Sequence, residues 1–71
     1  MSYTDDGKVI ANNIRAERNR VKLSQQEVSD KLKISTKTYL TYEKDASNIT
    51  AKHLLQLSKL FNCNITSFFI I

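Results

Sequence analysis

The apolar residues between Ser24 and Glu43 are spaced irregularly, and this spacing constrains the fold more than any other feature of the chain. They lie at Val28, Leu32, Ile34, Tyr39 and Tyr42. An amphipathic helix repeats its apolar positions every three or four residues and a strand every two, so neither pattern fits the whole segment. Two short helices separated by a break do fit. The segment therefore predicts a pair of helices with a tight connection.

The length and composition of the chain favour one small all-helical domain. Its 71 residues are expected to form a single domain, 1–71. The chain has no proline and one glycine, Gly7, and such a scarcity of turn formers disfavours a sheet. A lone cysteine, Cys63, excludes an internal disulfide. We expect an all-α fold.

No segment has the pattern of a secretion signal or a membrane span. Residues 1–9 lack a basic stretch followed by an apolar one, and the apolar ending at 68–71 is far too short to cross a bilayer. We therefore expect a cytoplasmic protein in a reducing compartment, with no membrane partner.

The chain carries an excess of positive charge. Eleven Lys and Arg against 7 Asp and Glu give a net charge of +4, and no acidic residue follows Asp45. A basic surplus suits a polyanion such as nucleic acid, but many soluble domains carry a similar charge as solvation alone. The charge is compatible with a nucleic-acid partner without identifying one.

The first helix is expected to begin after Asp5 or Asp6, whose carboxylates can accept hydrogen bonds from free backbone N–H groups. It should run from Lys8 to about Val21. Arg18 lies between its apolar positions on nearly the same face. A charged side chain in that place needs an oppositely charged partner.

The next two helices each begin at a serine. Ser24 and Glu27 have the spacing of a capping box, which predicts a second helix over 25–32. Ser35 can cap the third helix, which should end near Lys44. Only residues 33–35 connect the two helices. A connection this short forces them to cross steeply, as in a helix-turn-helix.

A fourth helix is expected after Thr50, and a last short helix is expected to start at Asn64 or Thr66. The sequence thus predicts five helices. In order and spacing they resemble the Cro/repressor-type helix-turn-helix family of phage and bacterial transcription regulators, also called the xenobiotic-response-element family. The resemblance spans about 10–69 and is carried by the segments IRAER, LSQQEVSDKL, IS followed by TYLTYE, and LLQLSKLFNCNITSFF.

This resemblance implies a compact five-helix, lambda-repressor-like DNA-binding domain with its helix-turn-helix at about 25–44. The chain departs from the family where helices two and three touch, since it has Ser29 in place of alanine. It also has Lys33 in place of the usual glycine at the turn. A lysine at positive φ costs on the order of 1 kcal/mol relative to glycine, which the fold can tolerate.

The resemblance also implies that the third helix enters the major groove of double-stranded DNA. The residues that would read bases are Thr36, Lys37 and Thr41. Lysine can donate to guanine O6 and N7, and threonine can hydrogen-bond a base or place its methyl against thymine. The residues that would contact the DNA backbone are Gln25, Gln26, Thr38 and Lys44. The alternatives are that 35–38 is only a polar helix start and that Gln26 braces the third helix.

Two further features follow from the family positions. Arg18 and Glu43 match residues that form a structural ion pair beneath the helix-turn-helix. Because one such domain reads few base pairs, we expect a homodimer on two half-sites. The apolar chain end supplies a candidate interface of Phe68, Phe69, Ile70 and Ile71. The alternatives are that this tail folds back onto the first helix, or that it binds a different regulator protein.

Nothing in the sequence predicts catalysis, a metal or a cofactor. His53 lacks neighbours at zinc-ligand spacing, and Cys63 lacks an activating neighbour. We find no glycine-rich phosphate loop, triad or paired carboxylates. We therefore expect a sequence-specific DNA-binding regulator, a repressor of phage or similar origin, and not an enzyme. The alternative is a protein-binding module of the same fold, such as an antitoxin or a modulator that pairs with a separate repressor.

Overall fold

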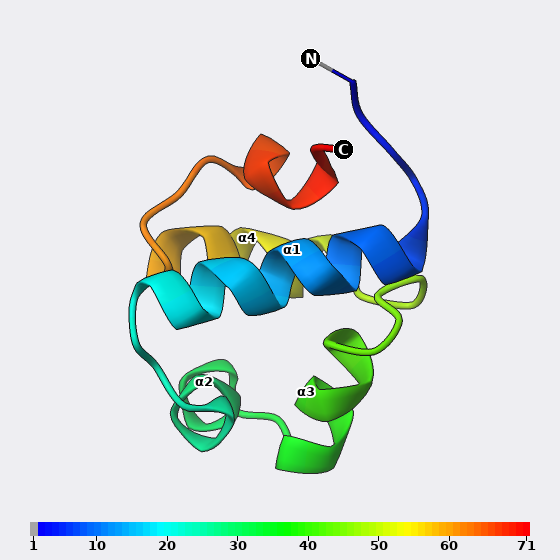
Figure 1. Cartoon of the computed structure of the whole chain (residues 1–71). Coiled ribbons are helices and arrows are strands. Elements are labelled where there is room, and N and C mark those ends of the chain that lie inside the picture. The colour runs from blue at the N-terminus through cyan, green and yellow to red at the C-terminus, as the bar shows by residue number, and fades with distance from the viewer. Residues whose placement is uncertain (1) are drawn as a thin grey trace.

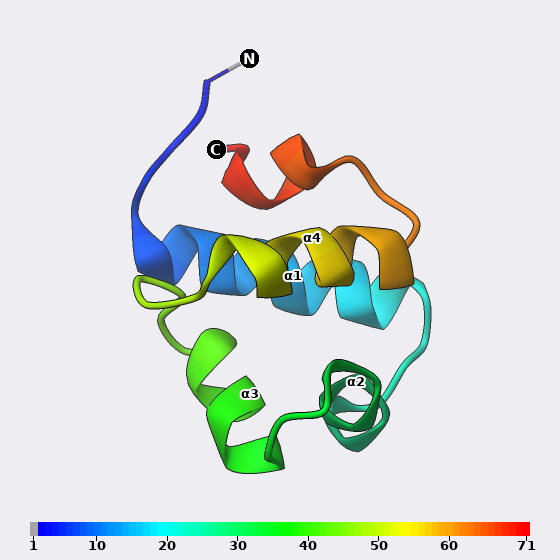
Figure 2. The ribbon, with the colours of Figure 1, turned by 180° about the vertical axis from the view of Figure 1, so that it is seen from behind.

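The computed structural model describes residues 2–71, which form four α-helices and one short 3-10 helix. They are α1 (Gly7–Arg20), α2 (Gln25–Leu32), α3 (Thr36–Tyr42), α4 (Ala51–Leu60) and η1 (Ile65–Phe69). The helices α1 and α4 make a middle layer, with α2 and α3 on one side and η1 with both chain ends on the other (Figure 1; Figure 2). The predicted all-α architecture is confirmed, with the last helix a 3-10 turn.

Polar side chains begin the α-helices where the sequence predicted them. Asp6, Ser24, Ser35 and Thr50 each accept a hydrogen bond from a backbone N–H in the first turn of the helix that follows. The capping box at the start of α2 is complete. The expected helix ends were slightly too late, since α1 ends at Arg20 and α3 at Tyr42. Within residues 2–71, no helix is long and apolar enough to cross a membrane.

Residues in the left-handed region end three of these helices. Lys22 follows α1 with φ 60°, Lys33 caps α2 with φ 58°, and Asn62 follows α4 with φ 52°. Asparagine tolerates this conformation better than lysine does, and glycine tolerates it best. The positive φ expected at Lys33 is present.

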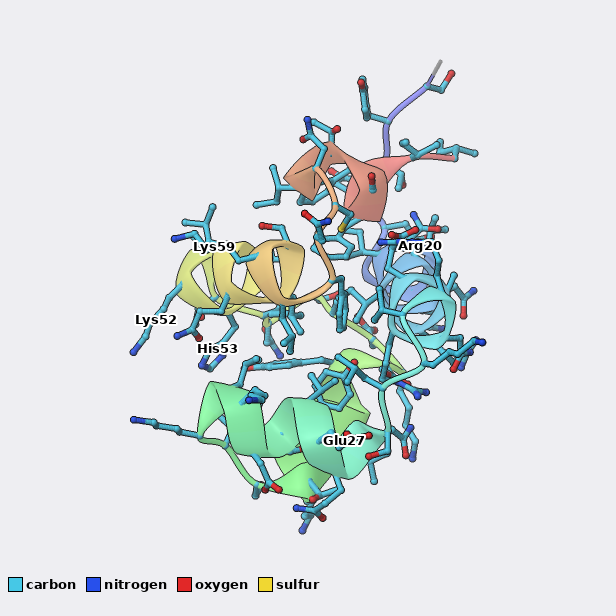
Figure 3. All side chains as sticks on the ribbon, turned by 90° about the vertical axis from the view of Figure 1, so that its left-hand side faces the viewer. Arg20, Glu27, Lys52, His53 and Lys59 are labelled. Carbon is cyan, nitrogen blue, oxygen red and sulfur yellow. The ribbon has the colours of Figure 1, made fainter. Side chains whose placement is uncertain are left out.

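One continuous core joins the two sides of the middle layer. Its buried apolar members are Ile10, Ala11, Ile14, Val28, Leu32, Tyr39, Tyr42, Ala46, Leu57, Phe61 and Phe68. The rings of Phe61 and Phe68 meet edge to face, with centroids 6.3 Å apart. Arg20 reaches from α1 to the end of α4 (Figure 3), where its Nη2 donates to the Phe61 carbonyl at 2.6 Å.

The tail folds back against α1, which was the alternative to a free apolar end. Asn13 Nδ2 donates to the carbonyl oxygens of Phe68 at 3.0 Å and Ile70 at 2.8 Å. Tyr3 pairs with Ile70 in an isolated antiparallel bridge. Phe68 is fully buried, so its predicted place in a dimer interface is wrong, because its ring completes the core of its own chain. Phe69 and Ile70 are half-buried, and Ile71 is exposed.

The connection from α3 to α4 closes against the start of α1. The backbone N–H of Ala46 donates to the Gly7 carbonyl at 2.9 Å. A Cβ atom on Gly7 would collide with the side chains of Asp45 and Ser47 and would lie 2.7 Å from the Ser47 nitrogen. The only glycine of the chain is therefore placed where a side chain has no room.

Candidate nucleic-acid interface

The helix-turn-helix places α3 at the edge of the molecule farthest from the chain ends (Figure 1; Figure 2). Tyr39 and Tyr42 anchor the helix because their side chains are buried in the core. Its opposite face is exposed and, apart from Leu40, polar. The predicted contact residues Lys37, Thr38, Thr41 and Lys44 are exposed, and Thr36 is half-buried. Lys44 lies just beyond the end of the helix.

Gln26 braces the start of α3. The Thr36 hydroxyl donates to Gln26 Oε1 at 2.9 Å, and Gln26 Nε2 in turn donates to Asp30 Oδ1 at 2.8 Å. The structure thus has the bracing contact that the sequence left open. Thr36 and Gln26 form a single hydrogen-bonded unit across the turn.

The other polar side chains of α3 differ in whether their hydrogen-bonding groups are used within the protein. The Thr41 hydroxyl donates to the Lys37 carbonyl at 3.2 Å, inside the helix. Thr38 Oγ1 accepts from the Ser35 hydroxyl at 2.9 Å. The Lys37 ammonium makes no hydrogen bond or ion pair to residues 2–71, so all its donors face solvent. Its donors remain available for a ligand.

A buried ion pair ties the helix-turn-helix to α1. Arg18 Nε lies 2.6 Å from Glu43 Oε2, and Arg18 Nη2 lies 3.2 Å from Glu43 Oε1. Arg18 Nη1 also donates to the Leu23 carbonyl at 2.9 Å. Glu43 is only 4% exposed. The arginine on the apolar stripe of α1 thus has the partner that its position requires.

Gln25 joins the same network. Its Nε2 donates to Glu43 Oε1 at 3.2 Å, a contact that the sequence did not predict. The carboxylate of Glu43 therefore collects donors from α1 and α2 at the end of α3. The expected phosphate contact of Gln25 stays a prediction, and the structure shows its side-chain amide engaged within the protein.

The network is charged at neutral pH. Burial raises the pKa of the Glu43 carboxyl, but hydrogen bonds from Arg18 and Gln25 outweigh it, so the pKa lies below its usual value. The bond to Glu43 likewise raises the pKa of Arg18. The Tyr39 hydroxyl is buried, without a hydrogen bond of standard geometry. Burial and the nearby carboxylate raise its pKa, so it stays neutral.

His53 and Cys63 serve packing. His53 points from α4 toward α3 (Figure 3), and its Nδ1 lies 2.9 Å from the Tyr42 hydroxyl oxygen. Cys63 is half-buried against the core, and burial raises the pKa of its thiol. Across residues 2–71, no three His, Cys, Asp or Glu side chains gather as they would around a metal ion.

Buried side chains hold one face of α3 against the core, its other face is free, and α2 crosses it steeply. This arrangement is that of the helix-turn-helix class of DNA-binding domains. A family model of helix-turn-helix domains matches residues 14–68. The chain belongs to this family, that of the Cro/repressor-type helix-turn-helix domains.

Two further comparisons bear on the fold. No curated protein matches the chain. The crystal structure of Fe(II)-HppE with the alternative substrate (S)-1-HPP is similar, with TM-score 0.83, 16% identity, and coverage of 97% of this chain and 35% of that one. Apo-HppE gives TM-score 0.82, 15% identity and coverage of 92% and 36%. The chain thus spans little more than a third of HppE, and at this identity the likeness shows the fold alone.

Proposed function

We propose that this protein is a sequence-specific repressor that places α3 in the major groove of an operator, acting in the cytoplasm and without enzymatic activity. The observation that carries the proposal is the outer face of α3, where Lys37 and Thr41 are exposed while Tyr39 holds the helix from within. A helix that reads base edges has to be held rigidly by the rest of the domain and to have one polar face free.

The proposal includes binding as a homodimer on two half-sites. Tyr3 is 59% exposed and Ile71 74% exposed, and these paired chain ends offer apolar surface to a second copy. Half-sites lie about 34 Å apart on one side of the duplex. For both α3 helices to face the same DNA, the second copy has to contact these chain ends from beside the domain and not from the face opposite α3.

The experiment that tests the proposal is selection of bound duplexes from a random pool, followed by footprinting. On the selected duplex, Lys37→Ala should relax the preference at one base pair by roughly 1–3 kcal/mol. Lys44→Ala is the matched control, because it removes an exposed lysine predicted to contact phosphate. It should weaken all sequences alike and lower the slope of log affinity against log salt by about 1.

Failure to enrich any motif with the folded protein would contradict the proposal. Uniform losses from both lysine variants would mean that α3 is not the helix that reads bases. Light scattering over a concentration series, with and without a palindromic duplex, tests the dimer. A protein that stays monomeric in both would refute it.

A second candidate function is binding of a separate regulator protein. It is favoured by the exposure of Tyr3 and Ile71 and by the position of the two chain ends, which lie on the side of the middle layer away from α3 (Figure 1). A partner held there would leave α3 free. Tight binding to another protein, with no enriched DNA motif, would favour this candidate.

A further inference from the structure

Leu40 is a large apolar side chain on the exposed side of the helix proposed to read DNA. It is 37% exposed. Its exposed neighbours at helical spacing are Lys37, three residues before it, and Lys44, four residues after it. Among residues 2–71, the exposed large apolar side chains are Tyr3, Leu40, Leu55 and Ile71, and Leu40 is the one in the helix-turn-helix. A lone exposed leucine is common in proteins, so its meaning depends on what surrounds it.

Two of the three threonines near Leu40 have no hydrogen-bond donor left for a base, whereas the Thr38 hydroxyl accepts from Ser35 and keeps its O–H donor. A threonine hydroxyl has one O–H donor. Thr36 gives its donor to Gln26 Oε1, and Thr41 gives its donor to the Lys37 carbonyl. Of the three predicted base-reading side chains, only Lys37 keeps free N–H groups. Apart from the Thr38 hydroxyl and the Lys44 ammonium, the rest of this surface offers acceptor oxygens, methyl groups and the leucine.

This division limits which bases the surface can recognise. Free lysine donors suit the O6 and N7 acceptors of guanine. An apolar side chain suits the 5-methyl group of thymine, the one apolar group that a base presents in the major groove. Lys37 and Leu40 are three residues apart, which is about 4.5 Å along a helix axis. That distance is little more than one base step of about 3.4 Å.

We propose that Leu40 recognises the 5-methyl group of a thymine one or two base pairs from a guanine that Lys37 contacts. This inference rests on the proposed function, since it assumes that α3 lies in the major groove. The helix that carries Leu40 is fixed to the rest of the domain both before and after this residue. One turn before it, Thr36 is bonded to Gln26, and three residues after it, Glu43 is fixed by Arg18.

Replacement of thymine by deoxyuridine tests the inference, because it removes the methyl group and changes nothing else on the base edge. The probe is the best duplex selected from a random pool, with each thymine replaced in turn. For the wild type we expect a loss of about fourfold in affinity at one position, the equivalent of one buried methylene-sized group. That position should adjoin the guanine whose preference Lys37→Ala relaxes.

Two variants assign the effect to a side chain. Leu40→Ala should bind the thymine and deoxyuridine duplexes equally well at that position. Thr41→Ser is the matched control, since it removes the neighbouring methyl group and keeps the hydroxyl, and it should retain the fourfold difference. If Thr41→Ser abolishes the difference and Leu40→Ala keeps it, the assignment to Leu40 is wrong. Thermal unfolding of both variants verifies that they are folded.

The outcomes separate this inference from the proposed function. A selected motif that binds equally well with thymine or deoxyuridine at every position overturns the role of Leu40 and leaves the DNA-binding function intact. A motif with no thymine within two base pairs of the Lys37 guanine does the same. If no motif is enriched, the proposed function fails and the inference fails with it.

Discussion

The two sides of the α1–α4 layer are held in different ways. On the η1 side, which comprises η1 and the paired residues 2–4 and 69–71, contact is made by aromatic packing and by neutral hydrogen bonds from Asn13. On the helix-turn-helix side, made of α2 and α3, apolar packing is supplemented by the buried pair of Arg18 and Glu43. The directional charged contact thus lies on the side that carries α3, the helix proposed to read DNA.

The reason lies in the difference between the two kinds of contact. Apolar burial depends on area and tolerates small shifts of one helix against another. An arginine that makes two hydrogen bonds to one carboxylate tolerates little displacement, because both hydrogen bonds have a preferred geometry. Removing one partner of the pair is also costly, because the other would remain as a buried charge with no opposite charge beside it.

The largest effect should therefore come from Glu43→Ala. It leaves Arg18 unpaired and partly buried, and we expect a loss of about 3–5 kcal/mol in the free energy of unfolding. Urea unfolding followed by circular dichroism measures it. Glu17→Ala is the control, because it breaks the pair with Arg20, which is 51% exposed. That variant should lose less than about 1 kcal/mol. Similar losses from both variants would show that burial of the charge is not what matters.

The same pair predicts how stability depends on pH. The pKa of Glu43 is lower in the folded protein than its usual value of 4.5, so its contribution is complete above that value. As the pH falls through the lower folded pKa, the carboxylate is protonated and the contribution is lost. Glu27 and Asp45 also have lowered pKa values, from hydrogen bonds with Ser24 and Ser47 respectively.

Unfolding titrations of the wild type and of Glu43→Gln between pH 7 and pH 2 isolate the Glu43 part. The acid-induced loss should be smaller in the variant, with the remainder due to the other two carboxyls. Parallel curves for the two proteins would rule out this assignment.

A smaller effect is expected on the η1 side from Asn13→Ala. Two hydrogen bonds to the carbonyls of Phe68 and Ile70 are lost, which should cost about 1–2 kcal/mol. Asn12→Ala is the control, since that exposed side chain bonds only to Arg15. Hydrogen exchange should show faster exchange at Ile71 and little change in α3. Equal acceleration in both places would mean that the two sides are not independent.

The contrast also explains what could be predicted from the sequence. Helix starts depend on a capping side chain and the next few residues, so the capping box at Ser24 and Glu27 could be predicted from local spacing. The ion pair of Arg18 and Glu43 is not local, and it came only from a family resemblance. The two hydrogen bonds from Asn13 to the chain end could not be predicted from local spacing, because their acceptors lie 55 and 57 residues away.

The chain end shows the same limit from another direction. Periodicity indicates that one phenylalanine belongs in the core but does not say whether it is Phe68 or Phe69. That choice depends on where η1 docks, and the docking uses Asn13 and the bridge between Tyr3 and Ile70. Likewise, the amide of Gln25 was expected to meet phosphate, and tertiary structure brings it to Glu43.

The smallest effect concerns the left-handed residues, which occur on both sides of the layer. Lys33 ends α2 with φ 58°, and Asn62 follows α4 with φ 52°. The left-handed conformation costs a lysine about 1–2 kcal/mol. Glycine avoids this cost, but its larger entropy in the unfolded state cancels part of the stabilisation. Lys33→Gly should therefore stabilise the protein by up to about 1 kcal/mol.

Asn62→Gly should give a smaller gain, because asparagine already tolerates positive φ. Lys31→Gly, two residues earlier and exposed on α2, should instead destabilise by about 1 kcal/mol, which separates the effect of φ from loss of a surface charge. Thermal unfolding of the three variants measures these differences. Equal gains from Lys33→Gly and Asn62→Gly would mean that the turn of the helix-turn-helix carries no more backbone strain than the corresponding turn on the η1 side. In that case the cost of the tight connection must lie in the crossing of α2 and α3, not in the residue that ends α2.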